Sequence, residues 1–215
     1  MELPFTVGQF LGVFTSYNEA VWPIQIILNG MALSIVFLAL KQFSHSDRSI
    51  SLILGLLWLW TGLVYHMSFF APINPAAFGF GAMFVVQGLL FIWMATRDGI
   101  RYRAAGNWKG IIGSAFVVYG LLVYPILGHM LGHVFPASPT FGAPCPTTIF
   151  TFGILLWAKG VPRYVLIIPA LWSLIGSSAA VSLGIQEDFG LLVAGVVGTT
   201  VMITSRSHVS VRSVK

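Results

Sequence analysis

Three histidines and the single cysteine carry the side chains best suited to chemistry. His129 and His133 are four residues apart, so on a helix their imidazoles project from one face. His66 ends another apolar stretch, and Cys145 lies in a proline-rich segment. Imidazole and thiolate bind divalent transition metals, and two histidines at matching depth could hold haem iron. The sequence therefore predicts His66, His129, His133 and Cys145 as metal or ligand contacts.

Further polar residues fall at the same ends of the apolar stretches as these four. Glu19 and Asp188 are the expected charge partners. Ionisable side chains within membrane spans usually face the protein interior or a water-filled path, so we expect a cavity open to one side. The expected lining residues are Glu19, Tyr65, Asn74, Tyr124, Thr147, Thr148 and Asp188.

The amino-acid composition indicates the class of protein that holds these residues in place. Of 215 residues, 57% are hydrophobic and 8% are charged, and the mean hydropathy is +0.89. An ordinary soluble domain carries about 25% charged residues. A water-soluble globule is therefore excluded, and the sequence predicts an all-α, polytopic bundle in a lipid bilayer.

Seven apolar stretches approach the length of about 20 residues that a bilayer requires. The predicted spans are residues 22–40, 50–70, 76–96, 111–135, 147–158, 164–183 and 189–205. All eleven Lys and Arg residues then fall on one side, which by the positive-inside rule is cytoplasmic. The N-terminus is expected outside and the basic tail, residues 206–215, inside. The net charge of +5 is explained by the placement of Lys and Arg on the cytoplasmic side of the predicted spans, so it does not indicate nucleic-acid binding.

Two flanking features complete the predicted domain organisation. Residues 1–21 form an expected amphipathic segment on the outer surface, with Thr6 and Gln9 spaced as a helix capping box. The fifth span is short, and residues 136–146 before it hold four prolines. This segment either lines a cavity at membrane depth or lies in the headgroup layer. Pro146 suits the first position of the fifth helix, which predicts Cys145 as its N-cap.

Known seven-span families resemble the chain only in part. Microbial rhodopsins share the span count, but residues 189–205 contain no lysine for a retinal Schiff base, so retinal is excluded. The histidines resemble the zinc site of ceramidase and adiponectin-receptor type hydrolases in residue types only, since the His129–His133 pair is on the fourth span rather than the last.

A closer resemblance covers nearly the whole chain. The stretches WLWTGLVYHMSFF with INPAA, GHVFPASPTFGAPCPTTIF, and PALWSLIGSSAA with LGIQEDFGLL resemble an uncharacterised family of bacterial multi-pass membrane proteins. The resemblance implies a bacterial inner membrane and a periplasmic outer side, and it brings no activity, cofactor or catalytic residue.

Several functions remain open on these observations. The first hypothesis is a periplasm-facing His/Cys pocket that binds or transports a small solute or a metal ion. The second is an intramembrane zinc-dependent hydrolase, in which Glu19 or Asp188 activates water. Haem ligation by His66 with His129 or His133 is the third, and an accessory subunit without chemistry is the fourth.

Overall fold

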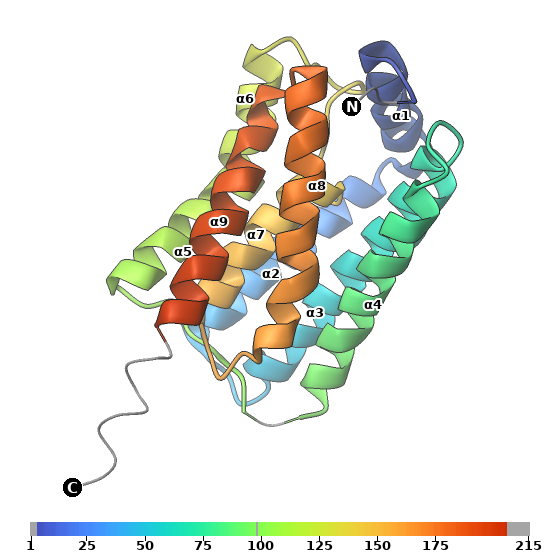
Figure 1. The fold of residues 1–215 in the computed structure, drawn as a ribbon. Helices are drawn as coiled ribbons and strands as arrows, with labels where there is room; N and C mark the ends of the chain where they lie inside the picture. The colour runs from blue at the N-terminus through green and yellow to red at the C-terminus, as the bar shows by residue number, and fades with distance from the viewer. Residues whose placement is uncertain (1–3, 98, 206–215) are drawn as a thin grey trace, which may run out of the picture.

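The computed structural model describes residues 4–97 and 99–205 as an almost entirely helical bundle (Figure 1). The all-α prediction is confirmed. The predicted basic tail, residues 206–215, lies outside the described residues. The α-helices are α1 (Val7–Val21), α2 (Ile24–Lys41), α3 (Ser46–Trp60), α4 (Ala77–Ala95), α5 (Trp108–Val118), α6 (Tyr124–Met130), α7 (Pro144–Trp157), α8 (Ile167–Leu183) and α9 (Phe189–Thr204). Two segments are π-helices, η1 (Thr61–Phe70) and η2 (Tyr119–Val123). Two short 3-10 helices are η3 (Arg163–Leu166) and η4 (Gln186–Asp188).

Within residues 4–97 and 99–205, six continuous helical stretches are long and apolar enough to cross a membrane. They are Ile24–Lys41, Ser46–Phe70, Ala77–Ala95, Trp108–Met130, Arg163–Leu183 and Gln186–Thr204. The remaining apolar helix, α7, has 14 residues and so extends about 21 Å, which is less than the ~30 Å of bilayer hydrocarbon.

Helix α7 lies at the centre of the bundle, between α5, α8, α9 and α3 (Figure 1). Every residue of α7 except Cys145 is buried, as expected for a helix that is apolar on all sides. Two of its threonine hydroxyls form hydrogen bonds in the core: Thr148 Oγ1 donates to the carbonyl oxygen of Pro144 at 2.8 Å, and Thr151 Oγ1 accepts from Trp58 Nε1 at 3.0 Å. A Cβ on Gly113 would lie 2.8 Å from the carbonyl oxygen of Gly153, so α5 and α7 pack backbone to backbone.

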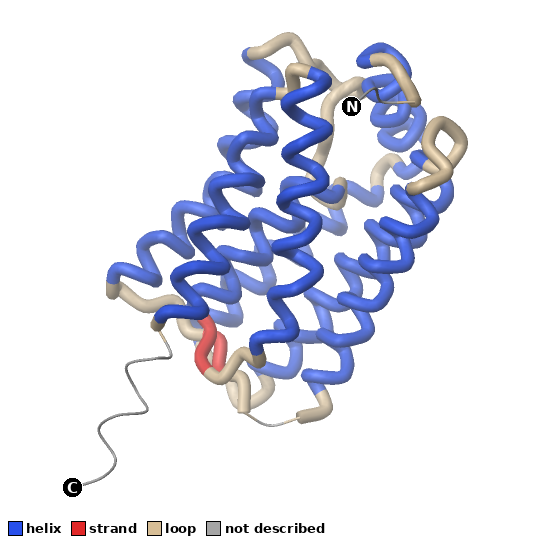
Figure 2. Tube along the Cα trace, in the orientation of Figure 1, coloured by secondary structure: helices blue, strands red, loops and turns tan. Residues whose placement is uncertain are grey.

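The two ends of the bundle differ in charge. At one end, which we call the basic end, lie the Lys and Arg residues in or beside the connections α2–α3, α4–α5 and α7–α8. Strands β1 (Arg101–Tyr102) and β2 (Ala158–Lys159) pair antiparallel there (Figure 2). The opposite end, which we call the acidic end, carries α1 and Glu19, Glu187 and Asp188.

The sequence predicts how two helices begin, and both predictions can be compared with the structure. The capping box of Thr6 and Gln9 is present at the start of α1, so that prediction is confirmed. The prediction that Cys145 caps α7 is wrong: the helix begins at Pro144 and its N-cap is Ala143. Pro144 satisfies the same preference for proline in the first turn as Pro146 does, which moves the start two residues earlier.

Candidate binding cavity

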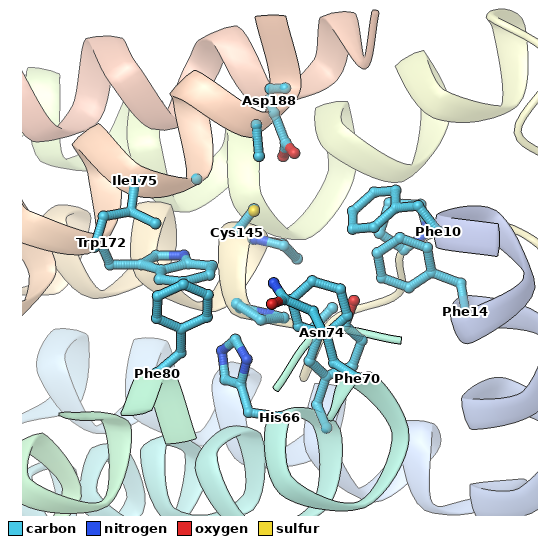
Figure 3. Close-up of a pocket in the computed structure, with 18 of the residues that line it drawn as sticks. Phe10, Phe14, His66, Phe70, Asn74, Phe80, Cys145, Trp172, Ile175 and Asp188 are labelled. Carbon is cyan, nitrogen blue, oxygen red and sulfur yellow. The ribbon is translucent and has the colours of Figure 1, made fainter. Parts of the chain in front are cut away.

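A partly open cavity of about 190 Å³ lies at the acidic end, between α1, η1, α4, α8 and the start of α7 (Figure 3). Its wall is mostly apolar. Eight aromatic residues contribute to it: Phe5, Phe10, Phe14, Tyr65, Phe70, Phe80, Tyr124 and Trp172. We call this the aromatic cavity. It lies next to the first turn of α7, because Pro144, Cys145 and Pro146 also line it.

The π-helix η1 supplies the wall that contains His66. Ten residues from Thr61 to Phe70 adopt this wider helix, and Tyr65, His66 and Phe70 within it all line the cavity. π-Helical segments are rare and occur frequently at functional sites, because they shift the side chains that follow to a new face.

His66 is fully buried among aromatic rings. Its relative exposure is 0%, and its ring centroid lies 4.8 Å from that of Phe84 and 5.0 Å from that of Trp172. Neither Nδ1 nor Nε2 has a hydrogen-bond partner among the described residues. A buried polar group without a partner is costly. His66 is therefore a group that a bound molecule could satisfy.

Asp188 supplies a carboxylate on the opposite side of the cavity (Figure 3). The side chain is 4% exposed, and its Oδ1 accepts a hydrogen bond from the Tyr124 hydroxyl at 2.5 Å. The Cys145 thiol lies beside the carboxylate. No Lys, Arg or His in the described ranges lies within ion-pair distance of Asp188.

The neighbouring acid, Glu187, is also buried, with 0% exposure. Its Oε1 lies 2.6 Å from His133 Nδ1, whereas its Oε2 has no hydrogen-bond partner in the described part of the chain. The Tyr119 hydroxyl donates to the backbone carbonyl of Glu187 at 2.8 Å. The two adjacent buried carboxylates therefore differ in their partners: Glu187 contacts His133, whereas Asp188 accepts from Tyr124 and lines the cavity.

Helix α1 forms one wall of the cavity, and Asn18 and Tyr17 form hydrogen bonds that join it to the bundle. Asn18 Nδ2 donates to the carbonyl oxygens of Pro136 and Ser138, both at 2.7 Å. The buried Tyr17 hydroxyl accepts a hydrogen bond from Trp60 Nε1 at 2.7 Å. Burial raises the pKa of Tyr17 to about 12, because the phenolate would lose its hydration.

Six of the eleven residues predicted as ligands or lining line this one cavity: His66, Cys145, Tyr65, Asn74, Tyr124 and Asp188. The other five lie elsewhere. His129 and Glu19 are exposed, and Thr147 and Thr148 are buried within α7. His133 contacts Glu187 instead.

The four predicted ligands do not come together as one set. Across residues 4–97 and 99–205, no three His, Cys, Asp or Glu side chains lie close enough to hold one metal ion. His66 and Cys145 share the aromatic cavity, whereas His133 is bound to Glu187 and His129 faces outward.

Sequence reasoning missed three parts of the site. It did not include Glu187 among the candidate residues, although two consecutive acids in so apolar a chain indicate a special environment. It also did not place Trp172 in the cavity, nor Phe10 and Phe14. Their spacing of four residues puts both on one face of α1, which was the available signal.

Comparison with known proteins gives one match. The model of a family described as a family of unknown function, DUF6064, matches residues 7–213. No curated protein and no solved structure matches the chain.

Proposed function

The chain belongs to DUF6064, a family of unknown function, and we propose that it is a multi-pass membrane protein that binds a small, mostly apolar molecule bearing a basic nitrogen. The observation that carries the proposal is the Asp188 carboxylate, which lines an aromatic cavity without a cationic partner among the described residues. The binding site is the aromatic cavity.

The chemistry of the lining favours a cation over an anion or a neutral molecule. The faces of Trp, Tyr and Phe rings attract a cation through their quadrupoles, and the attraction is larger where water is excluded. Trp172, Phe80 and Tyr65 supply such rings, and Asp188 supplies the opposite charge. The remaining apolar wall suits a hydrocarbon or aromatic body, since ligand pockets combine such walls with a few polar groups.

His66 adds a second polar contact. Its two ring nitrogens have no partner in the part of the chain that the structure describes, so one can donate to or accept from a polar group on the ligand. Asp188 and His66 come from different helices and face the same cavity (Figure 3). We therefore expect a ligand with its basic nitrogen near Asp188 and any second polar group near His66. Transport of this molecule, as opposed to binding, stays a prediction from the sequence.

The membrane arrangement is also part of the proposal. Six helices are long enough to cross, and α7 together with residues 136–143 would complete a seventh crossing. The segregation of Lys and Arg at the basic end supports a cytoplasmic location for that end. The aromatic cavity would then face the periplasmic side of a bacterial inner membrane.

Three matched probes test the binding proposal on the detergent-purified full chain. They are 4-phenylbutylamine, the neutral 4-phenylbutanol and the anionic 4-phenylbutyrate, with binding followed by calorimetry. We expect the amine to bind most tightly. Asp188→Asn should weaken amine binding by about thirtyfold, equivalent to ~2 kcal/mol, because the cation loses its buried partner. Binding of the alcohol should change little.

The control is Glu19→Gln, which removes an exposed carboxylate at the same end of the bundle. It should leave all three affinities unchanged. Equal binding of amine and alcohol by the unmodified protein would refute the proposal, as would an Asp188→Asn variant that keeps its preference for the amine.

A further inference from the structure

A second recess lies at the basic end of the bundle, far from the aromatic cavity. It encloses about 530 Å³ between the start of α5, the end of α7, the α7–α8 connection and the end of α9. Its apolar surface comes from the helices, with Leu155 and Leu156 of α7, Leu166 of η3 and Met202 of α9. Figure 1 shows these helix ends side by side, and Figure 2 shows the β1–β2 pair at the same end.

Three cations from three separate segments converge on the rim of this recess. Lys109 lies in the first turn of α5, Lys159 in β2 and Arg163 at the start of η3. No Asp or Glu in the described ranges lies within ion-pair distance of any of the three. The recess therefore combines unneutralised positive charge at its rim with an apolar floor.

The residues beside these cations are typical of a membrane interface. Trp108 precedes Lys109 and is 56% exposed, and Tyr164 follows Arg163 and is 41% exposed. Exposed Trp and Tyr residues are enriched where lipid headgroups meet hydrocarbon. In the proposed membrane arrangement, on which this inference rests, the rim of the recess would lie at the depth of the headgroups and its floor would extend toward the hydrocarbon.

We infer that this recess binds an anionic phospholipid of the surrounding leaflet. The phosphate would contact Lys109, Lys159 and Arg163, and an acyl chain would pack on the apolar floor. Basic pockets between helices on the cytoplasmic side of membrane proteins recognise anionic headgroups in this way. Lys and Arg residues generally lie at the cytoplasmic end of membrane proteins. That tendency alone does not explain this recess, because it does not require three cations to converge on one site above an apolar floor.

Native mass spectrometry of the detergent-purified full chain tests the inference. Phosphatidylglycerol and phosphatidylcholine, which differ in headgroup charge, are titrated separately, and inorganic phosphate is added as a competitor. We expect phosphatidylglycerol to bind more tightly than phosphatidylcholine, and millimolar phosphate to displace it poorly. The triple variant Lys109→Gln, Lys159→Gln, Arg163→Gln should lose about a hundredfold in phosphatidylglycerol affinity, roughly fivefold for each cation.

The matched control is Lys41→Gln, Arg97→Gln, Arg103→Gln, which removes three cations at the same end but outside the recess. It should retain phosphatidylglycerol binding. A second variant, Met202→Trp, fills the recess while keeping every charge, so it should also lower the affinity even if the triple variant fails to fold.

Three results would overturn the inference. The first is equal binding of the two lipids, and the second is an equal loss in the recess variant and the control. The third is binding of inorganic phosphate as tight as that of the lipid, which would make the recess a site for free anions. None of these results bears on the aromatic cavity, so this inference and the proposed binding of a basic ligand can fail independently.

Discussion

His133 Nδ1 lies 2.6 Å from Glu187 Oε1, and this pair joins the segment after α6 to the turn that begins α9. The Glu187 side chain is fully buried, whereas that of His133 is 16% exposed. His133 is therefore the group that pairs with the buried Glu187 carboxylate.

Removing the histidine should destabilise the protein. His133→Ala leaves Glu187 buried and unpaired, so we expect a loss of about 3 kcal/mol in the free energy of unfolding. Thermal unfolding in detergent, followed by tryptophan fluorescence, measures this. Glu187→Gln in the same background should restore part of the loss, because a neutral amide is cheaper to bury. His129→Ala is the control, since His129 is exposed one turn earlier; an equal effect of the two alanine variants would contradict the prediction.

Asn18 should hold the segment at residues 136–140 against α1. Besides its two donated hydrogen bonds, its Oδ1 accepts one from the Thr140 hydroxyl at 2.8 Å and a longer one from Gln25 Nε2 at 3.4 Å. Asn18→Ala removes these bonds, including the three to residues 136–140, and we expect a loss of about 2–3 kcal/mol together with faster proteolysis within 136–140. The neighbouring variant Glu19→Ala, at an exposed position, serves as the control. Unchanged protease resistance in Asn18→Ala would show that the segment is held by other contacts.

Gly142 occupies a position that no other residue fits well. Its φ is +99°, and a Cβ there would lie 2.4 Å from Leu28 Cδ1. Gly142→Ala should therefore lower the free energy of unfolding by about 2 kcal/mol or more. Gly30→Ala, on the open side of α2 with no atom within 4 Å of the added Cβ, should be neutral or slightly stabilising. Similar melting temperatures for the two variants would contradict the assigned strain.

Tyr17 should make the fold sensitive to alkaline pH. Its pKa in the folded protein is about 12, against 10.0 for the ordinary side chain. The folded state thus favours the neutral phenol, so its contribution is complete below pH 10 and is lost as pH rises from about 10 to about 12. Tyr17→Phe should show a smaller drop in melting temperature over this interval than the unmodified protein. An identical pH profile would mean that the Tyr17 phenol remains solvated.

The direction of insertion can be measured by cysteine labelling on intact cells. In a Cys145→Ala background, Glu19→Cys places a thiol at the acidic end and Arg103→Cys places one at the basic end, both at exposed positions. A membrane-impermeant maleimide should label the first in intact cells and the second only after lysis. The reverse pattern would invert the proposed orientation, and equal labelling of both would refute an odd number of crossings.

Features encoded within a few residues could be predicted from the sequence. The capping box of Thr6 and Gln9 needs only a spacing of three residues, and the helical class follows from composition. The depth of the polar groups was also predictable, because distance along a helix fixes it. For that reason His66, Cys145 and Asp188 could be expected at one level.

Lateral position within the bundle could not be predicted. No local pattern states which helices are neighbours, so the sequence could not place His133 beside Glu187 rather than beside His66. The π-helix at Thr61–Phe70 also changes the helix face on which His66 lies. The spacing of apolar residues does not distinguish a π-helix from an α-helix here, so this change of face could not be predicted.

The burial of α7 has a consequence for how the chain reaches its final form. A helix of 14 residues is a poor substrate for independent insertion, and its surface meets α3, α5, α8 and α9 rather than lipid. Two of these neighbours, α8 and α9, are synthesised after it. In the proposed membrane arrangement, α7 therefore reaches its final position only after α8 and α9 have packed against it. The centre of the bundle is then assembled last rather than first.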